Sequence, residues 1–242
     1  MSSNQFELKA VDKTKVYDSI VEQILAAIRS GAFPPGSVLP PERELAAQVG
    51  VSRGSVREAI RVLEYAGVLD VRTGSGTYVT EAGGSKSVAL RAHAAVVGEE
   101  SPLDVMIARR ALEPVAAQYA ALNRHPRDLI ALRNSVAEQA RLVKQGEDPS
   151  EPDLFFHIAL AGASRNPVLR MLFERIAEIM QQETWVAMKH RSRDRPGRQE
   201  LYLDEHRLIL EKVQKQDGAG AADAMQRHLD SVEEGLIAEV EE

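Results

Sequence analysis

Apolar side chains recur every three to four residues through the first third of the chain, which is the period of amphipathic helices. Within residues 14–30 they share one helical face: Val16, Ile20, Ile24, Leu25 and Ile28. The same period predicts a short helix within residues 41–49, which begins after two prolines, and a longer helix within 52–66. A glycine directly follows each of the three segments, so the pattern predicts three helices before residue 68.

The hydrophobic pattern changes after residue 67. VLDVR at 68–72 and TYVT at 77–80 are short β-type runs, and the TGSG between them predicts a β-hairpin. The next segment, EAGGSK at 81–86, is small and polar and has no apolar anchor. We interpret it as a linker between two domains.

No strand pattern follows residue 86. Seven segments show a helical period, and prolines stand at or near the starts of most of them: 86–97, 102–123, 126–145, 151–163, 166–190, 197–216 and 218–241. We therefore expect a mainly α protein. It has a domain of residues 10–80 with three helices and a β-hairpin, a linker at 81–86, and an all-α bundle of about seven helices in 87–241.

Composition agrees with two globular domains. The chain has 242 residues, of which 44% are hydrophobic and 27% charged, as in ordinary folded proteins. It has no cysteine, which excludes disulfides and thiolate metal sites. Neither an apolar run of membrane-spanning length nor an N-terminal signal-peptide core is found in the sequence, so we expect a cytoplasmic protein without membrane contact.

The formal net charge of −6 is unevenly distributed. Residues 1–80 hold nine basic and nine acidic side chains, so the whole excess of acid belongs to the rest of the chain. A neutral first domain is not a basic patch, and any interpretation as a DNA-binding protein must depend on where its arginines stand.

The element order of the first domain is that of a winged helix-turn-helix, with two short helices joined by a turn at Gly50 and followed by a hairpin. The second helix of such a pair enters the major groove, and an arginine side chain matches guanine or a phosphate there. The candidate DNA-binding residues lie on this helix, at the start of the preceding one and at the hairpin tip: Arg43, Arg53, Gly54, Ser55, Arg57, Arg72, Gly74 and Gly76. The alternative is a solvated helix face on which Arg53, Arg57 and Arg61 pair with Glu58 and Glu64.

Residues 39–79, LPPERELAAQVGVSRGSVREAIRVLEYAGVLDVRTGSGTYV, resemble the DNA-binding domain of GntR-family transcriptional regulators. The resemblance implies that Arg43, Arg53, Arg57 and the glycines of the wing contact a double-stranded DNA operator. Gly54 departs from the family pattern, in which a hydroxyl residue often stands, so one contact is expected to be missing.

Four residues of the second domain are candidate metal ligands. Asp153 and His157 are four residues apart on one predicted helix, and His206 and His228 lie beside apolar residues of the last two helices. Three neutral imidazoles and one carboxylate suit Zn²⁺, Ni²⁺, Mn²⁺ or Fe²⁺ and leave one or two coordination positions open. The alternative is that each histidine is an ordinary hydrogen-bonded residue; we interpret His93, His125 and His190 as such surface residues.

The second domain resembles the all-helical, FCD-type ligand-binding domain of the FadR subfamily. The resemblance rests on four segments: ARRALEPVAAQYAA (108–121), DLFFHIALAGASRNPVL (153–169), EHRLIL (205–210) and AMQRHL (224–229). It implies that the aspartate and the three histidines bind a divalent metal ion, and that Arg109 pairs with an effector carboxylate.

Three assignments in the second domain leave alternatives open. Arg109 is also placed for a salt bridge to Glu113, its i+4 neighbour. Asn166 contacts the effector or caps the following helix. The basic stretch KHRSRDRPGR at 189–198 is interpreted as a solvated loop, with one arginine lining the pocket.

The function expected from these features is a homodimeric, ligand-responsive transcriptional repressor that reads a near-palindromic operator. Its effector is a small carboxylate such as a hydroxy acid, a sugar acid or a dicarboxylate. The linker and the helix at 86–97 are expected to transmit effector binding to the DNA-binding domain. The alternatives are an acyl-CoA sensor and a metal-dependent enzyme acting on a small carboxylate. The enzyme is disfavoured because no further carboxylate or histidine stands out as a general base.

Overall fold

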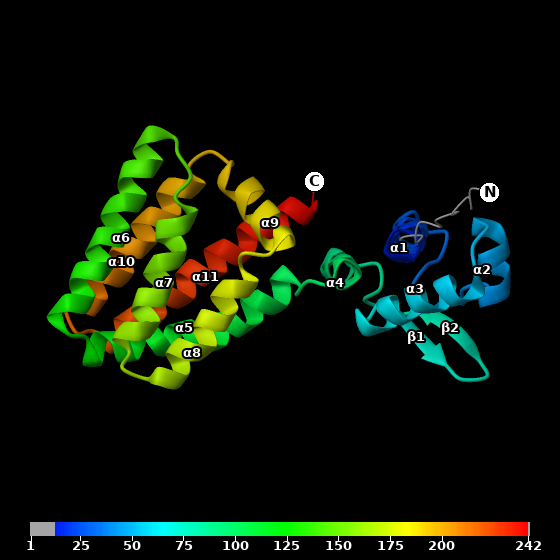
Figure 1. Cartoon of the computed structure of the whole chain (residues 1–242), viewed down its shortest axis with the longest axis horizontal. Coiled ribbons are helices and arrows are strands. Elements are labelled where there is room, and N and C mark those ends of the chain that lie inside the picture. Colours follow the sequence, from blue (N-terminus) through cyan, green and yellow to red (C-terminus); the bar gives the residue numbers. More distant parts are fainter. Residues whose placement is uncertain (1–12, 242) are drawn as a thin grey trace, which may run out of the picture. The chain divides into compact units, whose positions relative to one another are not determined.

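The computed structural model describes residues 13–241, so the first three residues of the predicted domain at 10–80 lie outside the described part. The chain divides into two compact units, Met1–Gly98 and Glu99–Glu242. Among the described residues there are eleven helices and one two-stranded sheet, which confirms the mainly α fold (Figure 1).

The first unit contains the predicted helices and hairpin: α1 (Lys13–Arg29), α2 (Glu42–Val49), α3 (Arg53–Tyr65), β1 (Leu69–Arg72), β2 (Gly76–Val79) and α4 (Lys86–Val97). Gly50 ends α2 with a left-handed φ of 70°, a conformation that glycine adopts without strain. Ser52 then caps α3, because its side chain accepts a hydrogen bond from the Ser55 amide. These two residues make the tight turn that separates α2 from α3.

The core of the first unit lies between α1, α3 and the hairpin. Buried side chains of α1 meet the apolar stripe of α3: Val56, Ala59, Ile60 and Leu63. Val38 forms an antiparallel β-bridge with Tyr78 of β2, a pairing outside the hairpin that the sequence did not predict. The segment between α1 and α2 is thereby held against the hairpin.

The predicted linker and the predicted domain boundary differ from the structure. α4 packs on α1 and α3, and its Val88 and Ala92 belong to the core of the first unit. Gly83 is buried, and a Cβ atom built on it would lie 2.6 Å from the Val68 carbonyl oxygen. Residues 81–86 are therefore a packed turn rather than a free linker, and the boundary between the units falls after Gly98.

The second unit consists of seven helices in its described part: α5 (Pro102–Asn123), α6 (Pro126–Gln145), α7 (Ser150–Ala163), α8 (Pro167–Ile179), α9 (Glu183–Arg193), α10 (Arg198–Gln214) and α11 (Gly218–Glu241). The helix predicted at 166–190 is two helices, because the backbone leaves the helical conformation between Met180 and Gln182. The number seven still holds, since α4 belongs to the first unit. α7, α10 and α11 all pack on α5, which brings side chains from four helices to one place.

The basic stretch predicted as a solvated loop is partly helical. Its first five residues form the last turns of α9, and Lys189, Ser192 and Arg193 are buried. Across residues 13–241, no helix is both long enough and apolar enough to cross a membrane.

Candidate functional site

The N-terminal part of α3 carries the arginines expected to read DNA. Arg53 on α3 and Arg43 on α2 are exposed, and neither forms an ion pair within the described structure. Gly54 beside Arg53 is exposed, and packing does not require a glycine there, since a Cβ atom would meet its nearest neighbour at an ordinary 3.6 Å. The hydroxyl of Ser55 lies 2.9 Å from that of its capping partner Ser52. Arg43 and Arg53 are thus the arginines of the pair of helices that are most available to a phosphate or a base.

Arg57 is held by an acidic residue of the neighbouring helix. Its Nη2 donates to Oε2 of Glu42 at 2.9 Å, and its Nε lies 3.2 Å from both carboxylate oxygens. The Arg57 hydrogen bond and charge hold the pKa of Glu42 below its usual value. The alternative in which these arginines pair with Glu58 and Glu64 holds for Arg61, which pairs with Glu58, but not for Arg57. Arg57 therefore links α3 to α2 through an ion pair, and part of its guanidinium remains available for other contacts.

The hairpin forms a wing whose arginine is oriented by two side chains. Nε of Arg72 donates to Asp70 at 2.8 Å, and the guanidinium lies 4.2 Å from the centre of the Tyr78 ring. Gly74 and Gly76 have positive φ values of 78° and 129°, which side chains other than glycine rarely adopt. The glycines of the wing are thus required by its turn, whatever they contact.

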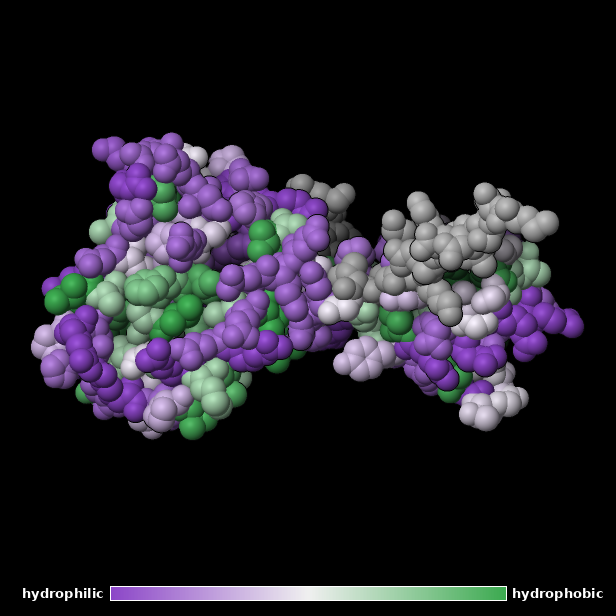
Figure 2. All heavy atoms as spheres, viewed as in Figure 1, coloured by the Kyte–Doolittle hydropathy of each residue, from purple (hydrophilic) through white to green (hydrophobic). Residues whose placement is uncertain are grey.

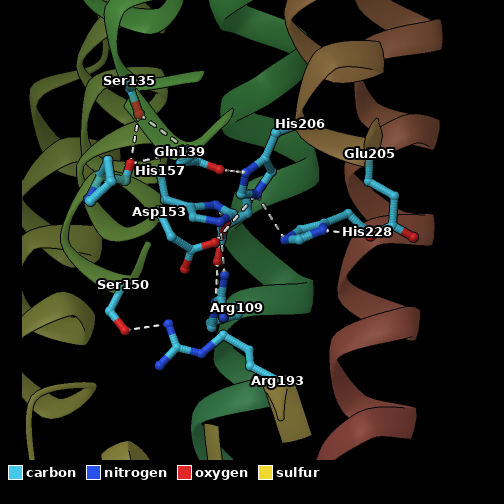
Figure 3. Close-up of polar contacts among 12 residues, drawn as sticks. Arg109, Ser135, Gln139, Ser150, Asp153, His157, Arg193, Glu205, His206 and His228 are labelled. Atoms are coloured by element: carbon cyan, nitrogen blue, oxygen red, sulfur yellow. Dashed lines mark hydrogen bonds and ion pairs between the residues drawn. The ribbon is translucent and has the colours of Figure 1, made fainter. Parts of the chain in front are cut away.

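Three histidines from three helices meet in the interior of the second unit (Figure 3). His157 of α7, His206 of α10 and His228 of α11 are each at most 2% exposed, and each offers one ring nitrogen within 4.8 Å of the others. Nε2 of His206 lies 3.2 Å from Nε2 of His228. Phe156 stacks on the His206 ring with 4.5 Å between ring centres, which fixes the plane of that ring.

The opposite nitrogen of each imidazole faces an oxygen atom of a further side chain. Nδ1 of His206 lies 2.7 Å from Oε1 of Gln139, and Nδ1 of His228 lies 2.8 Å from Oε2 of Glu205. Nδ1 of His157 lies 2.5 Å from Oε2 of Glu113, an ion-pair contact without the geometry of a hydrogen bond. Partners of this kind fix the ring orientation and the tautomer of metal-binding histidines.

The orientation of Gln139 decides the tautomer of His206. Nε2 of Gln139 donates to the Pro152 carbonyl oxygen at 3.2 Å, and a carbonyl only accepts, so Oε1 is the atom that faces His206. Nδ1 of His206 therefore carries the proton, and Nε2 carries a lone pair directed into the cluster. Glu205, whose pKa burial raises to about 7, has the same effect on His228 in its ionised form.

Asp153 completes the set of four predicted ligands. Its Oδ1 lies 3.8 Å from Nε2 of His206. Burial alone would raise the pKa of the Asp153 carboxyl, but the charge of Lys189 and the neighbouring imidazoles hold that pKa well below its usual value. Burial lowers the pKa values of His206 and His228 well below the usual value for histidine. The positive charges of the neighbouring imidazoles and of Lys189 lower them further.

The chemistry of this donor set fits a divalent metal ion. At neutral pH it offers an ionised Asp153 and, at His206 and His228, neutral imidazoles whose Nε2 atoms face each other, which is the protonation state that metal binding requires. The geometry brings together Asp153, His157, His206 and His228, as the sequence suggested. Glu113, Gln139 and Glu205 were not predicted as part of the site. Two of them have a signal in the sequence: Glu113 stands four residues after Arg109, and Glu205 stands directly before His206. Gln139 has no such signal.

Arg109 lies beside the histidine cluster, where it forms the predicted salt bridge. It is 1% exposed, its Nε lies 2.5 Å from Oε1 of Glu113, and its Nη2 lies 3.4 Å from Nε2 of His157. The charge of Arg109 opposes the effect of burial on Glu113, whose pKa falls to about 2. Nη1 of Arg109 has no hydrogen-bond partner in the described structure.

A cavity of about 290 Å³ adjoins the cluster on the side of Asp153. Its walls come from the start of α7, the end of α8 and the inner face of α9: Asp148, Ser150, Glu151, Asp153, Leu154, Met180, Gln181, Trp185, Val186, Lys189, His190 and Arg193. Arg109 does not line it. Burial lowers the pKa of Lys189 to about 8, against the opposite effect of Asp153, so Lys189 stays protonated at neutral pH. Arg193 is the arginine of the basic stretch that lines the pocket.

Asn166 caps α8 through its side chain, which accepts hydrogen bonds from the amides of Val168 and Leu169. It does not line the cavity, whose nearest part of α8 is Met180 at the other end of the helix. Thirteen helical residues span roughly 20 Å. The capping alternative thus accounts for Asn166.

Comparisons with known proteins identify both units. The FCD domain family matches residues 104–231, and the family of bacterial regulatory proteins called gntR matches residues 16–79. The chain is 32% identical over 231 residues to the Uxu operon transcriptional regulator of Escherichia coli K12, with 94% of this chain and 89% of the relative covered. It is 29% identical over 231 residues to the putative L-lactate dehydrogenase operon regulatory protein of the same organism, covering 90% of this chain and 85% of that one.

Among solved structures, a GntR-family transcriptional regulator from Pseudomonas syringae pv. tomato DC3000 has the same fold. The TM-score is 0.51 at 22% sequence identity, and the match covers 96% of this chain and 88% of that one. The matched families and relatives are transcriptional regulators and not enzymes. The chain therefore belongs to the GntR family, as a DNA-binding transcriptional regulator whose second domain is of the FCD type.

Proposed function

We propose that this regulator is a ligand-responsive repressor that senses a small carboxylate through a metal-containing helical domain. The observation that carries the proposal is the convergence of three buried imidazoles, each with its Nδ1 facing an oxygen atom, beside a cavity of about 290 Å³. The cavity size suits a small organic acid better than an acyl-CoA, because ligand pockets for larger molecules occupy up to about 1,000 Å³.

The proposed metal ligands are Asp153, His157, His206 and His228. A divalent ion held by them, with Zn²⁺, Ni²⁺, Mn²⁺ and Fe²⁺ as candidates, would supply one or two open positions for oxygen atoms of the effector. Gln139 and Glu205 orient the imidazoles, and Phe156 shields His206. Asp153 lies at the wall of the cavity, so an effector there would be next to the metal position.

The class of effector proposed is a hydroxy acid, sugar acid or dicarboxylate. Hard oxygen donors such as a carboxylate and an adjacent hydroxyl suit these metals, and the cavity wall carries two buried cations. A relative is named for the L-lactate dehydrogenase operon, which agrees with a small hydroxy acid. Differential affinity of the acid for two arrangements of the regulator would then change its operator affinity.

The proposed DNA-binding residues are Arg43, Arg53, Gly54, Ser55 and Arg57, with Arg72, Gly74 and Gly76 of the wing. Two copies of this set in a homodimer would read a near-palindromic operator in the cytoplasm. Large apolar side chains are exposed on α5 and α8, two helices that pack together: Ile107, Val115, Tyr119, Leu122, Val168, Met171 and Leu172. Hydrophobic atoms are visible over α8 in Figure 2. An apolar face of this size supports the homodimer, because it would be covered by a second copy.

The test combines metal analysis with DNA binding. Metal in the purified protein is measured by mass spectrometry, and affinity for the DNA upstream of its own coding region is measured by fluorescence anisotropy with lactate, succinate or gluconate. We expect a bound divalent ion in the wild type, its absence from the Asp153→Ala/His157→Ala variant, and an operator affinity that one class of acid changes. A wild type that holds no metal, and whose operator affinity ignores metal and acids alike, would overturn the proposal.

A further inference from the structure

The inner face of α9 carries three large side chains spaced four residues apart, which places them in one row along the cavity wall. They are Trp185, Lys189 and Arg193, and they are 3%, 6% and 5% exposed. Two buried cations on one wall are unusual, since an ammonium or guanidinium group is removed from water only where an anion or a dense set of acceptors replaces the water.

Lys189 has no such replacement in the described structure. Its ammonium group lies 4.5 Å from the centre of the Tyr202 ring, and no hydrogen bond or ion pair to a carboxylate is formed. Asp153 is the anionic group whose charge acts most strongly on Lys189, but its carboxylate is directed at the histidine cluster. A cation in this position lacks a partner that an anionic ligand in the cavity would supply.

Arg193 is only partly satisfied. Its Nη1 donates to Oδ1 of Asp148 at 2.6 Å and to the hydroxyl of Ser150, which anchors the side chain at the cavity wall (Figure 3). Its Nε is buried and has no acceptor in the described structure. The Nε group is therefore a second donor that is positioned, desolvated and unpaired.

The charges of the site also favour an anionic ligand in the cavity. Arg109 is neutralised by Glu113, and Arg193 by Asp148, which leaves Lys189, Asp153 and the exposed Glu151 as the other charged groups of the site. When a divalent metal ion occupies the cluster, Asp153 is used as its ligand, and the site has an excess of positive charge beside a desolvated lysine. An anionic ligand would offset this excess.

We propose that Lys189 and Arg193, rather than Arg109, form the subsite that binds the anionic group of the effector. This inference rests on the proposed function and deepens it, since it names the residues that select an acid over a neutral molecule of the same shape. Trp185, Met180 and Leu154 line the apolar part of the cavity and hold the carbon skeleton of a small organic carboxylate. Arg109, which does not line the cavity, positions Glu113 and His157 instead.

The test measures discrimination between an acid and its amide in the full-length, metal-loaded protein. The probes are lactate, succinate and gluconate with lactamide, succinamide and gluconamide, and the readouts are the ligand-induced shift of melting temperature, the affinity by calorimetry and the metal content. The variants are Lys189→Met, the charge-retaining Lys189→Arg, Arg193→Met and Arg109→Gln. Metal content and circular dichroism identify any variant that has lost the fold.

We expect the wild type to prefer one acid over its amide. Lys189→Met should lose about tenfold or more in affinity for that acid, keep its weak affinity for the amide and keep its metal, since a hydrogen bond to a charged group is worth roughly 1.5–3 kcal/mol. Lys189→Arg should restore most of the preference, and Arg193→Met should weaken it.

Two results overturn the inference and are distinguishable. If Lys189→Met and Arg193→Met keep the full preference for the acid while Arg109→Gln abolishes it with metal still bound, the subsite belongs to Arg109, and the proposed function stands. If the wild type binds none of the acids and its operator affinity ignores them, the proposed function fails together with the subsite.

Discussion

Nε2 of His206 and Nε2 of His228 lie 3.2 Å apart and face each other. While Glu205 is ionised, the proton of each ring is held on Nδ1, by the carbonyl oxygen of Gln139 in one case and by the carboxylate of Glu205 in the other, so that both Nε2 atoms carry a lone pair. Two lone pairs at this distance in a dry interior repel each other. A cation between them removes the repulsion, and two nitrogens bound to one Zn²⁺ at about 2.0–2.1 Å are separated by a similar distance.

Loss of either facing imidazole should therefore remove the metal. We expect His206→Gln and His228→Gln to contain little metal after purification, while His93→Gln, a change at an exposed histidine of α4, keeps the full content. Mass spectrometry of the purified proteins measures this. A His228→Gln protein with undiminished metal content would show that the cluster is not the metal site.

Gln139 should tune metal affinity without contacting the metal. Gln139→Leu removes the acceptor that holds Nδ1 of His206, and partners of this kind typically contribute about 10–100-fold in metal affinity. Gln139→Glu keeps an oxygen at that position and should retain more of the affinity. Competition with a fluorescent chelator measures both constants, and equal affinities for the two variants would contradict the role assigned to Gln139.

Metal-free protein should become less stable as the pH falls from 7 towards 5. His206 and His228 take up protons near pH 6.5 in the unfolded chain but not in the folded one, because burial lowers their folded pKa values. Glu205 acts in the opposite direction, since burial raises its folded pKa to about 7. The excess of protons bound by the unfolded state is therefore close to zero at pH 7 and rises to about one near pH 5, where the free energy of unfolding should fall by about 1.4 kcal/mol per pH unit.

Urea titrations in the presence of a chelator at several pH values measure this slope. The His206→Gln/His228→Gln protein should no longer lose stability as the pH falls, because its unfolded chain lacks the two titrating groups and the opposite effect of Glu205 remains, whereas His93→Gln should behave as the wild type. A wild type whose stability is independent of pH over this range would show that the two imidazoles are not held neutral in the folded state.

Arg53 should contribute to operator affinity more directly than Arg57. Arg53 is exposed and has no ion-pair partner among residues 13–241, whereas Arg57 is bound to Glu42. If Arg53 contacts a base, Arg53→Ala should weaken operator binding by about 1–3 kcal/mol and leave binding to scrambled DNA nearly unchanged. If Arg53 contacts a phosphate, the affinity for both DNAs should fall equally. Fluorescence anisotropy with operator DNA and with scrambled DNA separates the two cases. Arg207→Ala, a change at an exposed arginine of α10, is the matched control. Unchanged affinity in Arg53→Ala would exclude it from the interface.

The sequence predicted most elements because their boundaries are marked by local chemistry. Gly50 and Ser52 define the turn between α2 and α3, and the spacing of Asp153 and His157 places them on one side of α7. The break between α8 and α9 was missed because residues 168–195 contain neither glycine nor proline, so the helical period runs through it unmarked. In the structure a residue distant in sequence holds the start of α9, since the Glu99 carboxylate accepts hydrogen bonds from the amides of Glu183 and Thr184.

The parts of the site that escaped prediction depend on how the helices pack. Gln139 is one of several glutamines, and only the position of α6 against α10 gives it a histidine to orient. Lys189 and Arg193 lie in a run of charges that suggests a solvated loop, yet the four-residue spacing from Trp185 places all three on the buried face of α9. The resemblance to a family suggested Arg109 for the effector, but not that Glu113 would also bind His157.

Gly83 should be essential for the packing of the segment first interpreted as a linker. A Cβ atom there would lie 2.6 Å from the Val68 carbonyl oxygen and 3.0 Å from Cγ1 of Val79, so Gly83→Ala forces the turn away from the hairpin. We expect a loss of about 1–3 kcal/mol, the range for overpacked sites. At the adjacent Gly84 the nearest atom, Cγ2 of Ile28, is 3.9 Å away, and Gly84→Ala should leave stability nearly unchanged.

Urea unfolding of the two single variants measures the difference directly. Because Gly83 lies between the hairpin and α4, its loss should also weaken the docking of α4 on α1 and α3, which hydrogen exchange of α4 amides would show as faster exchange. Equal stabilities for Gly83→Ala and Gly84→Ala would mean that residues 81–86 do behave as a free linker. The assignment of α4 to the DNA-binding unit would then lose its support.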